Sequence, residues 1–115
     1  MDEALEKALE FSNFSVTLNS QKRVLKENYK EDLILYYNGG KFSVTLPLFS
    51  FIANLNNLNI DKTVLVDDNE TPIEINDIEN FLELLTQKYA DASNKYLQRY
   101  KELSKKRSIE GIVDV

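Results

Sequence analysis

Apolar residues in the C-terminal part of the chain recur every three or four positions, which is the spacing of one face of a helix. This stripe predicts a long amphipathic helix over about 76–107. Asn76 followed by Glu79 resembles a capping box and predicts where the helix starts. After Ile78 and Leu82, the stripe continues through Leu85, Tyr89, Ala92, Tyr96, Tyr100 and Leu103.

The predicted helix is longer than a compact domain of this size is wide. About 30 helical residues span roughly 45 Å, whereas a compact chain of 115 residues has a diameter of roughly 35 Å. The part of the helix beyond about Tyr89 is therefore expected to project or to lie against another subunit. We interpret the stripe from Leu85 to Leu103 as an interaction surface.

A short apolar tail follows this helix. Gly111 can end the helix, and residues 108–115 contain four branched apolar side chains, Ile109, Ile112, Val113 and Val115. Such a segment is rarely left in water. We expect it to join the interaction surface, by adding to a sheet edge or by filling a groove on a partner. The alternative is that it folds back on its own domain or frays.

The N-terminal third gives a weaker pattern. Residues 2–11 predict a short helix with Asp2 as N-cap and Leu5, Ala8 and Leu9 on one face. The pentapeptide Phe-Ser-Val-Thr-Leu then occurs twice, at 14–18 and 42–46, and its alternation predicts a strand in both places. The polar stretch between the copies, 19–31, fits either a short helix or irregular strands.

A β-hairpin is predicted around a glycine-containing turn. An apolar run, 33–37, is followed by Asn38-Gly39-Gly40 and then by the second pentapeptide. A Gly39-Gly40 loop would place Tyr37 opposite Phe42, whereas an Asn38-Gly39 loop would keep the same faces in a shifted register. The sequence leaves both registers open.

The remaining elements complete an α+β fold. Pro47 suits the first turn of a helix whose apolar face is formed by Leu48, Phe51, Ile52, Leu55 and Leu58. Residues 63–66 and 71–75 predict a second hairpin around the acidic turn 67–70. We expect one domain with a small antiparallel sheet (hairpins around 33–46 and 63–75), short helices and the long C-terminal helix. Its parts are a body over 1–75, the helix over 76–107 and the tail over 108–115.

Composition removes most catalytic chemistry. The chain has no cysteine and no histidine, so it lacks thiolate nucleophiles and the commonest general base and metal ligand. Its three glycines form no phosphate-binding loop. The acidic turn 67–70 could offer oxygens to a hard cation, but it lacks the ligand spacing of an EF-hand and is what a hairpin needs. We assign no catalytic residue, metal or cofactor, and predict a protein that is not an enzyme.

Charge and hydropathy constrain the partners. The net charge is −5, yet residues 95–107 are basic and contain Tyr96 and Tyr100, a combination that can bind nucleic acid. Because both tyrosines lie on the apolar stripe, a solvated helix end is the preferred interpretation, and nucleic acid is not an expected partner. The chain shows no membrane-length apolar run and no signal peptide. We expect a cytoplasmic location and no secretion.

A family resemblance indicates a location for the protein. The segment Thr71-Pro72-Ile73-Glu74-Ile75-Asn76-Asp77-Ile78, the tyrosine-rich helix and the closing Lys106-Arg107-Ser108-Ile109-Glu110-Gly111-Ile112 resemble the C-terminal domain of unknown function in tailed-phage virion and tail-fibre-associated proteins. The resemblance covers 62–115 and implies a virion location and no catalytic residues.

The predicted function follows from the helix and this resemblance together. We predict a non-enzymatic structural or assembly protein of a phage particle, which acts by oligomerisation and docking through the long helix and tail. Its partners would be further copies of itself or a larger protein assembly, with no small-molecule substrate. The alternatives are a small adaptor or inhibitor that binds a host or cellular protein, and a nucleic-acid-binding module that uses 95–107.

Overall fold

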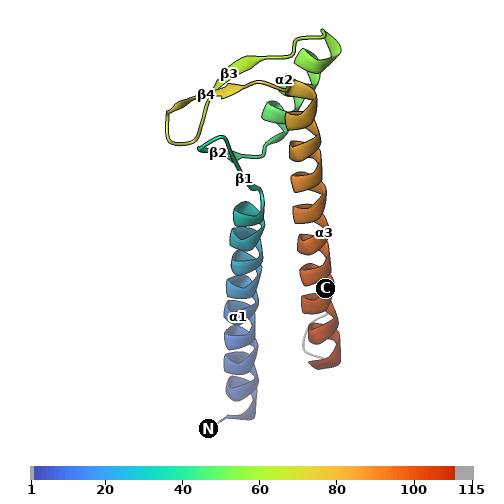
Figure 1. Cartoon of the computed structure of the whole chain (residues 1–115). Coiled ribbons are helices and arrows are strands. Elements are labelled where there is room, and N and C mark those ends of the chain that lie inside the picture. Colours follow the sequence, from blue (N-terminus) through green and yellow to red (C-terminus); the bar gives the residue numbers. More distant parts are fainter. Residues whose placement is uncertain (1, 111–115) are drawn as a thin grey trace. The chain divides into compact units, whose positions relative to one another are not determined.

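The computed structural model describes residues 2–110, except for the side chains of residues 11, 14–16 and 106–110. Over this range the chain forms three helices and four strands (Figure 1). Their order is α1 (Glu3–Asp32), β1 (Ile34–Tyr37), β2 (Gly40–Ser43), α2 (Leu46–Asn57), β3 (Thr63–Val66), β4 (Pro72–Ile75) and α3 (Ile78–Glu110). The predicted α+β class, with its two hairpins and long C-terminal helix, is confirmed.

The chain divides into two compact units. Unit 1 takes the described residues of Met1–Tyr29 and Lys95–Val115, and unit 2 is Lys30–Asn94. Unit 1 therefore consists of most of α1 and the C-terminal half of α3. Unit 2 contains both hairpins, α2 and the first half of α3. These boundaries differ from the predicted partition into body, helix and tail.

The first hairpin of unit 2 adopts one of the two predicted registers. Leu35 lies opposite Phe42 and Tyr37 opposite Gly40, so the loop is Asn38-Gly39. Asn38 and Gly39 have φ values of 49° and 81°. Positive φ at both loop positions is what a type I′ turn requires, and asparagine followed by glycine meets that requirement at low cost.

Gly40 is required by close packing. A Cβ atom at this position would lie 2.7 Å from Cγ1 of Ile73 and 2.9 Å from Cε2 of Phe42. Because contacts this short force neighbouring atoms to move, only glycine lets β2 approach the β4 side chain so closely. The first hairpin therefore packs on the second through a position that has no side chain.

The helix after β2 begins as predicted around Pro47. Thr45 has extended backbone angles, and its hydroxyl oxygen accepts a hydrogen bond from the Leu48 amide at 3.3 Å, so it caps α2. Pro47 lies in the first turn, where its missing N–H leaves no helical bond unmade. Of the predicted apolar face, Ile52 is buried whereas Phe51 stays exposed.

The hairpins form two separate two-stranded sheets, not the single sheet that was predicted. In the second hairpin, β3 pairs antiparallel with β4, and Val64 lies opposite Glu74. The two sheets are joined by hydrogen bonds outside their ladders. One runs from the Asn38 side-chain amide to the Glu74 carbonyl at 3.2 Å, and another from the Asp68 amide to the Lys41 carbonyl at 2.8 Å.

The core of unit 2 is centred on Phe81 of α3. Its ring meets Tyr37 and Phe42 edge-on, with ring centroids 5.0 and 5.6 Å away, an arrangement favoured by the aromatic quadrupoles. Residues from both hairpins, α2 and α3 are buried around it. The buried apolar side chains of this core are Phe42, Val44, Ile52, Ile73, Ile75, Ile78, Phe81 and Leu85.

The start of α3 differs slightly from the prediction. The carboxylate of Asp77, not the side chain of Asn76, accepts the amide hydrogen of Asn80 at 3.0 Å. The Ile78 amide donates to the Asp61 carbonyl at 3.0 Å, which satisfies another free N–H of the first turn. Asp77 is therefore the N-cap of α3. Its carboxylate also complements the positive end of the helix dipole.

The N-terminal third is the main correction to the predicted fold. One helix, α1, replaces the predicted short helix over 2–11, the strand over 14–18 and the ambiguous stretch 19–31. Asp2 is the N-cap, as predicted, and accepts the Ala4 amide hydrogen. Inside the predicted strand, the Thr17 hydroxyl donates to the Asn13 carbonyl at 3.0 Å, a bond typical of threonine in helices.

The physical reason for this correction is helix cooperativity. No glycine or proline occurs before Gly39, so no helix-breaking residue interrupts the chain between Glu3 and the end of α1 at Asp32. Breaking it at 14–18 would leave the amide and carbonyl groups of two new helix ends without partners. Continuing it costs only the modest helix propensities of phenylalanine, valine and threonine.

Candidate self-association surface

Unit 1 is a pair of antiparallel helical segments (Figure 1). Tyr29 near the end of α1 contacts Tyr96 of α3, with ring centroids 4.8 Å apart. Tyr96 also stacks on Tyr100 of its own helix, with ring centroids 6.5 Å apart. Tyr96 therefore packs against α1 of the same chain, and Tyr100 packs against Tyr96.

This helix pair buries none of its described side chains. The α1 residues that are half-buried include Leu18 and Leu25, but also the polar Gln21, Lys22 and Asn28. Polar groups of this kind contribute little to a dry contact and keep hydrogen-bonding needs of their own. Among the described side chains, the helices of unit 1 therefore lie together without forming a buried core.

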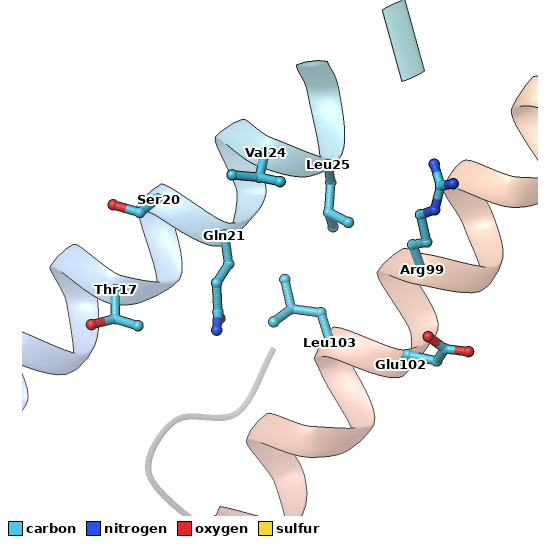
Figure 2. Close-up of a pocket in the computed structure, with 8 residues that line it drawn as sticks. All are labelled: Thr17, Ser20, Gln21, Val24, Leu25, Arg99, Glu102 and Leu103. Carbon is cyan, nitrogen blue, oxygen red and sulfur yellow. The ribbon is translucent and has the colours of Figure 1, made fainter. Parts of the chain in front are cut away.

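A groove runs along one side of the pair. Its volume is about 470 Å³, and Figure 2 shows Leu25 and Leu103 pointing toward each other from the two helices. Two of the α1 side chains that line it, Thr17 and Ser20, are small. The lining residues are Thr17, Ser20, Gln21, Val24, Leu25, Arg99, Glu102 and Leu103.

The N-terminal turns of α1 extend past the described end of α3. From the Tyr29–Tyr96 contact, α1 continues roughly 39 Å to Glu3, whereas α3 continues roughly 21 Å to Glu110. About 18 Å of α1 therefore has no described part of α3 beside it. Leu5 and Leu9 lie in this overhang and are 51% and 47% exposed.

The residues predicted as an interaction surface fall into three groups. Leu85 and Ala92 are buried within the chain itself. Tyr89 is exposed on unit 2, while Tyr96, Tyr100 and Leu103 are half-buried on unit 1. The tail positions lie outside the described side chains: Ile109, Ile112, Val113 and Val115.

Sequence reasoning missed the groove and the length of the overhang. Leu5 and Leu9 were placed on one helix face, but that helix was expected to end near Ser12. The signal that could have joined it to Val24 is the absence of any glycine or proline before Gly39.

Exposed apolar side chains also occur on unit 2, for example Tyr36, Val64 and Val66. These residues surround a complete core, and isolated apolar side chains on such a surface are ordinary. What distinguishes unit 1 is that its described part has no buried side chain at all.

The acidic turn of unit 2 has a structural role. The buried Asp67 carboxylate accepts backbone amide hydrogens from Lys41 at 2.9 Å, Asn69 at 3.0 Å and Thr71 at 2.8 Å. The bonds from Lys41 and Thr71 contribute most to lowering the pKa of Asp67 below its ordinary value, because they stabilise the charged form. Asp67 thereby ties the turn to β2.

The described part of the chain has neither a metal-binding cluster nor a membrane-spanning helix. Its side chains form no group of three metal-ligating residues. Within residues 2–110 no helix has both the length and the hydropathy needed to cross a membrane. Comparisons with known proteins gave no match, whether to a family model, a curated protein or a solved structure.

Proposed function

We propose that this chain is a non-enzymatic structural or assembly protein that self-associates through unit 1. The observation that supports this proposal is that no described side chain of unit 1 is buried. A stable domain needs at least two packed layers of secondary structure around one core. The two helical segments supply one layer, and a second copy of the chain supplies the other.

The surface available for this association is apolar at several points. Leu5, Leu9, Val24 and Leu97 of unit 1 are each about half exposed. Burial of such a side chain contributes up to about 1.5–3 kcal/mol when it is complete. Because these residues are already half covered and association has its own entropic cost, we expect a dissociation constant in the micromolar range.

The setting we propose is a phage particle, and it comes from the resemblance of residues 62–115 to the C-terminal domain in tailed-phage proteins. In that setting, self-association would build the component and the apolar tail would dock it onto a larger assembly. The tail residues of this proposal are Ile109, Ile112, Val113 and Val115.

The direct test is the native mass of the full chain, measured by sedimentation between about 1 and 100 μM, the range that separates weak from moderate affinity. We expect the mass to rise with concentration to that of a dimer or higher oligomer. Leu9→Glu should lower the oligomer fraction, because it places a charge on the exposed face of the overhang. Val64→Glu is the matched control on unit 2, where Val64 is also open to solvent. A wild-type monomer at about 100 μM would contradict self-association.

A nucleic-acid interface is the second candidate, because α1 and α3 each carry a basic segment. Residues 22–30 of α1 and 95–105 of α3 each carry four basic side chains and one acidic side chain. Duplex binding through them would weaken by roughly the 0.9 power of salt concentration per phosphate contact. We expect no duplex binding tighter than about 10 μM at physiological salt. Tighter, salt-sensitive binding that is lost in Lys22→Glu with Arg99→Glu would favour this candidate.

A further inference from the structure

Charge is distributed along residues 2–30 in three consecutive segments, which the acidic Glu31 and Asp32 follow at the end of α1. Residues 2–10 have four acidic side chains and one basic side chain, a net charge of −3. Residues 11–21 have no charged side chain, and residues 22–30 have a net charge of +3. A helix with this distribution is complementary to a second copy of itself in the antiparallel direction, because each acidic segment then lies beside a basic one.

One side of α1 carries the apolar and small residues that such a contact needs. Leu5 and Leu9 are four residues apart, Ser20 follows after eleven, and Val24 after four more. Spacings of four and eleven return to nearly the same side of a helix. Ser20 and Val24 line the groove of unit 1, and Leu5 and Leu9 belong to the exposed overhang.

We propose that α1 pairs antiparallel with α1 of a second copy, about a two-fold axis between residues 14 and 15. This inference rests on the proposed self-association and names its surface and register. In this register Leu5 lies opposite Val24 of the second copy, and Leu9 lies opposite Ser20. The overhang of each copy thereby occupies the groove of the other, whose small Ser20 side chain leaves room for leucine.

The charges favour this direction over the parallel one. Glu6 lies opposite Arg23 of the second copy, and the arrangement occurs twice by symmetry. The register also sets two like-charged pairs opposite each other, Asp2 with Glu27 and Lys7 with Lys22, but these residues belong to segments whose summed charges attract. In a parallel pair the two acidic segments would lie side by side, and so would the two basic segments. Like charges in such a contact repel and destabilise the pair.

The α3 segment of unit 1 also favours α1 of a second copy as the element that fills the groove. Three residues of α3 line the groove, Arg99, Glu102 and Leu103, and the segment that contains them, residues 95–105, has a net charge of +3. The lining itself has one basic and one acidic side chain, but an acidic overhang that enters the groove lies near two segments of positive net charge, 22–30 of α1 and 95–105 of α3. Arg99 and Glu102, which line this side of the groove, would flank the inserted turns.

Two single variants and their mixture test the register. Glu6→Lys alone and Arg23→Glu alone each create two like-charged pairs in a homodimer, so each should raise the dissociation constant roughly tenfold. When the two variants are mixed, the introduced lysine of one copy meets the introduced glutamate of the other, and the native pair Glu6 and Arg23 is restored on the opposite side. Native mass spectrometry should then show mostly heterodimer, with an affinity near that of the wild-type protein. Glu83→Lys is the control, because it makes the same change in charge on unit 2.

The outcomes separate this inference from the proposed function. Weak homodimers of both variants, rescued in the mixture, support the antiparallel register. A wild-type oligomer with no preference for the heterodimer overturns the register and leaves self-association standing. A wild-type protein that is monomeric throughout overturns both. Because Glu6 and Arg23 are exposed and their side chains form no part of a buried core, the single variants are expected to fold.

Discussion

Unit 1 and unit 2 share the helix α3 but use it differently. In unit 2 the first half of α3 is covered by two hairpins and α2, and eight apolar side chains are buried together. In unit 1, α1 lies beside the second half of α3, and no described side chain is buried. The difference teaches that helix length and regularity do not make a core. A core requires elements arriving from several directions.

The repeated pentapeptide makes the same point on a smaller scale. Phe-Ser-Val-Thr-Leu at 14–18 lies within α1, whereas at 42–46 its first two residues end β2 and its threonine caps α2. The first copy has long helix-forming flanks without glycine or proline. The second lies between the turn at Asn38-Gly39 and Pro47. Identical residues therefore adopt the structure that their neighbours impose.

The largest expected effect is the loss of stability caused by a cavity, and this loss should differ between the two units. Phe81→Ala empties the centre of the unit 2 core and should lower the free energy of unfolding by about 3–5 kcal/mol. Leu103→Ala, on half-buried Leu103 of unit 1, should cost about 1 kcal/mol in dilute solution, since most of its surroundings are already solvent. Urea unfolding followed by circular dichroism measures both. Equal losses would contradict the contrast between the units.

A smaller effect is expected where the hairpins of unit 2 meet. Gly40→Ala places a Cβ within 2.7 Å of Ile73 and should destabilise unit 2 by about 1–3 kcal/mol through overpacking. Gly39→Ala has no atom within 4 Å of the new Cβ but keeps a φ of +81°, so it should cost about 1 kcal/mol through backbone strain alone. Thermal unfolding of the two variants tests the order, and a larger loss for Gly39→Ala would refute the close approach.

The smallest of the three effects is a pH dependence confined to unit 2. The folded-state pKa of Asp67 is lowered, so its stabilisation is complete above the pKa of the unfolded chain, about 3.9, and is lost as pH falls through the lower folded value. Asp67→Asn should reduce the melting temperature at neutral pH by several degrees and weaken its decline in acid. The Asn side chain cannot accept from all three amides, because one of its terminal atoms is a donor.

In that experiment Asp68→Asn is the matched control. The Asp68 carboxylate accepts one hydrogen bond, from the Ser43 hydroxyl at 2.6 Å, at an exposed position. If Asp68→Asn weakened the fall of the melting temperature in acid as much as Asp67→Asn, the effect would come from the overall charge of the turn and not from the buried carboxylate.

The sequence was sufficient for the elements that carry local signals. Asn38-Gly39, Pro47 and the turn after Val66 mark the boundaries of both hairpins and of α2, because each imposes a backbone conformation on its own residues. The long stripe after Ile78 likewise predicted α3. The register at Asn38-Gly39 could not be chosen, since both registers put the same side chains on the same face.

The candidate surface was less accessible from the sequence. Leu85 and Ala92 follow the same spacing as Tyr96 and Leu103, yet the first two are buried in the chain and the others are only half covered. Periodicity shows that a face packs but not what covers it. The β-forming composition of residues 14–18 concealed that α1 runs unbroken past them, and with it the groove that α1 forms with α3.

The most direct test of the central claim, that the described side chains of unit 1 form no buried core and that unit 1 gains one by self-association, is amide hydrogen exchange at two protein concentrations. At about 1 μM the amides of residues 3–29 and 95–105 should exchange much faster than those of the unit 2 core, since helices without a packed face open readily. At about 100 μM their protection should rise while that of unit 2 stays the same. Strong protection of residues 3–29 that is equal at both concentrations would contradict the claim, because it would show that unit 1 is stable as a single copy.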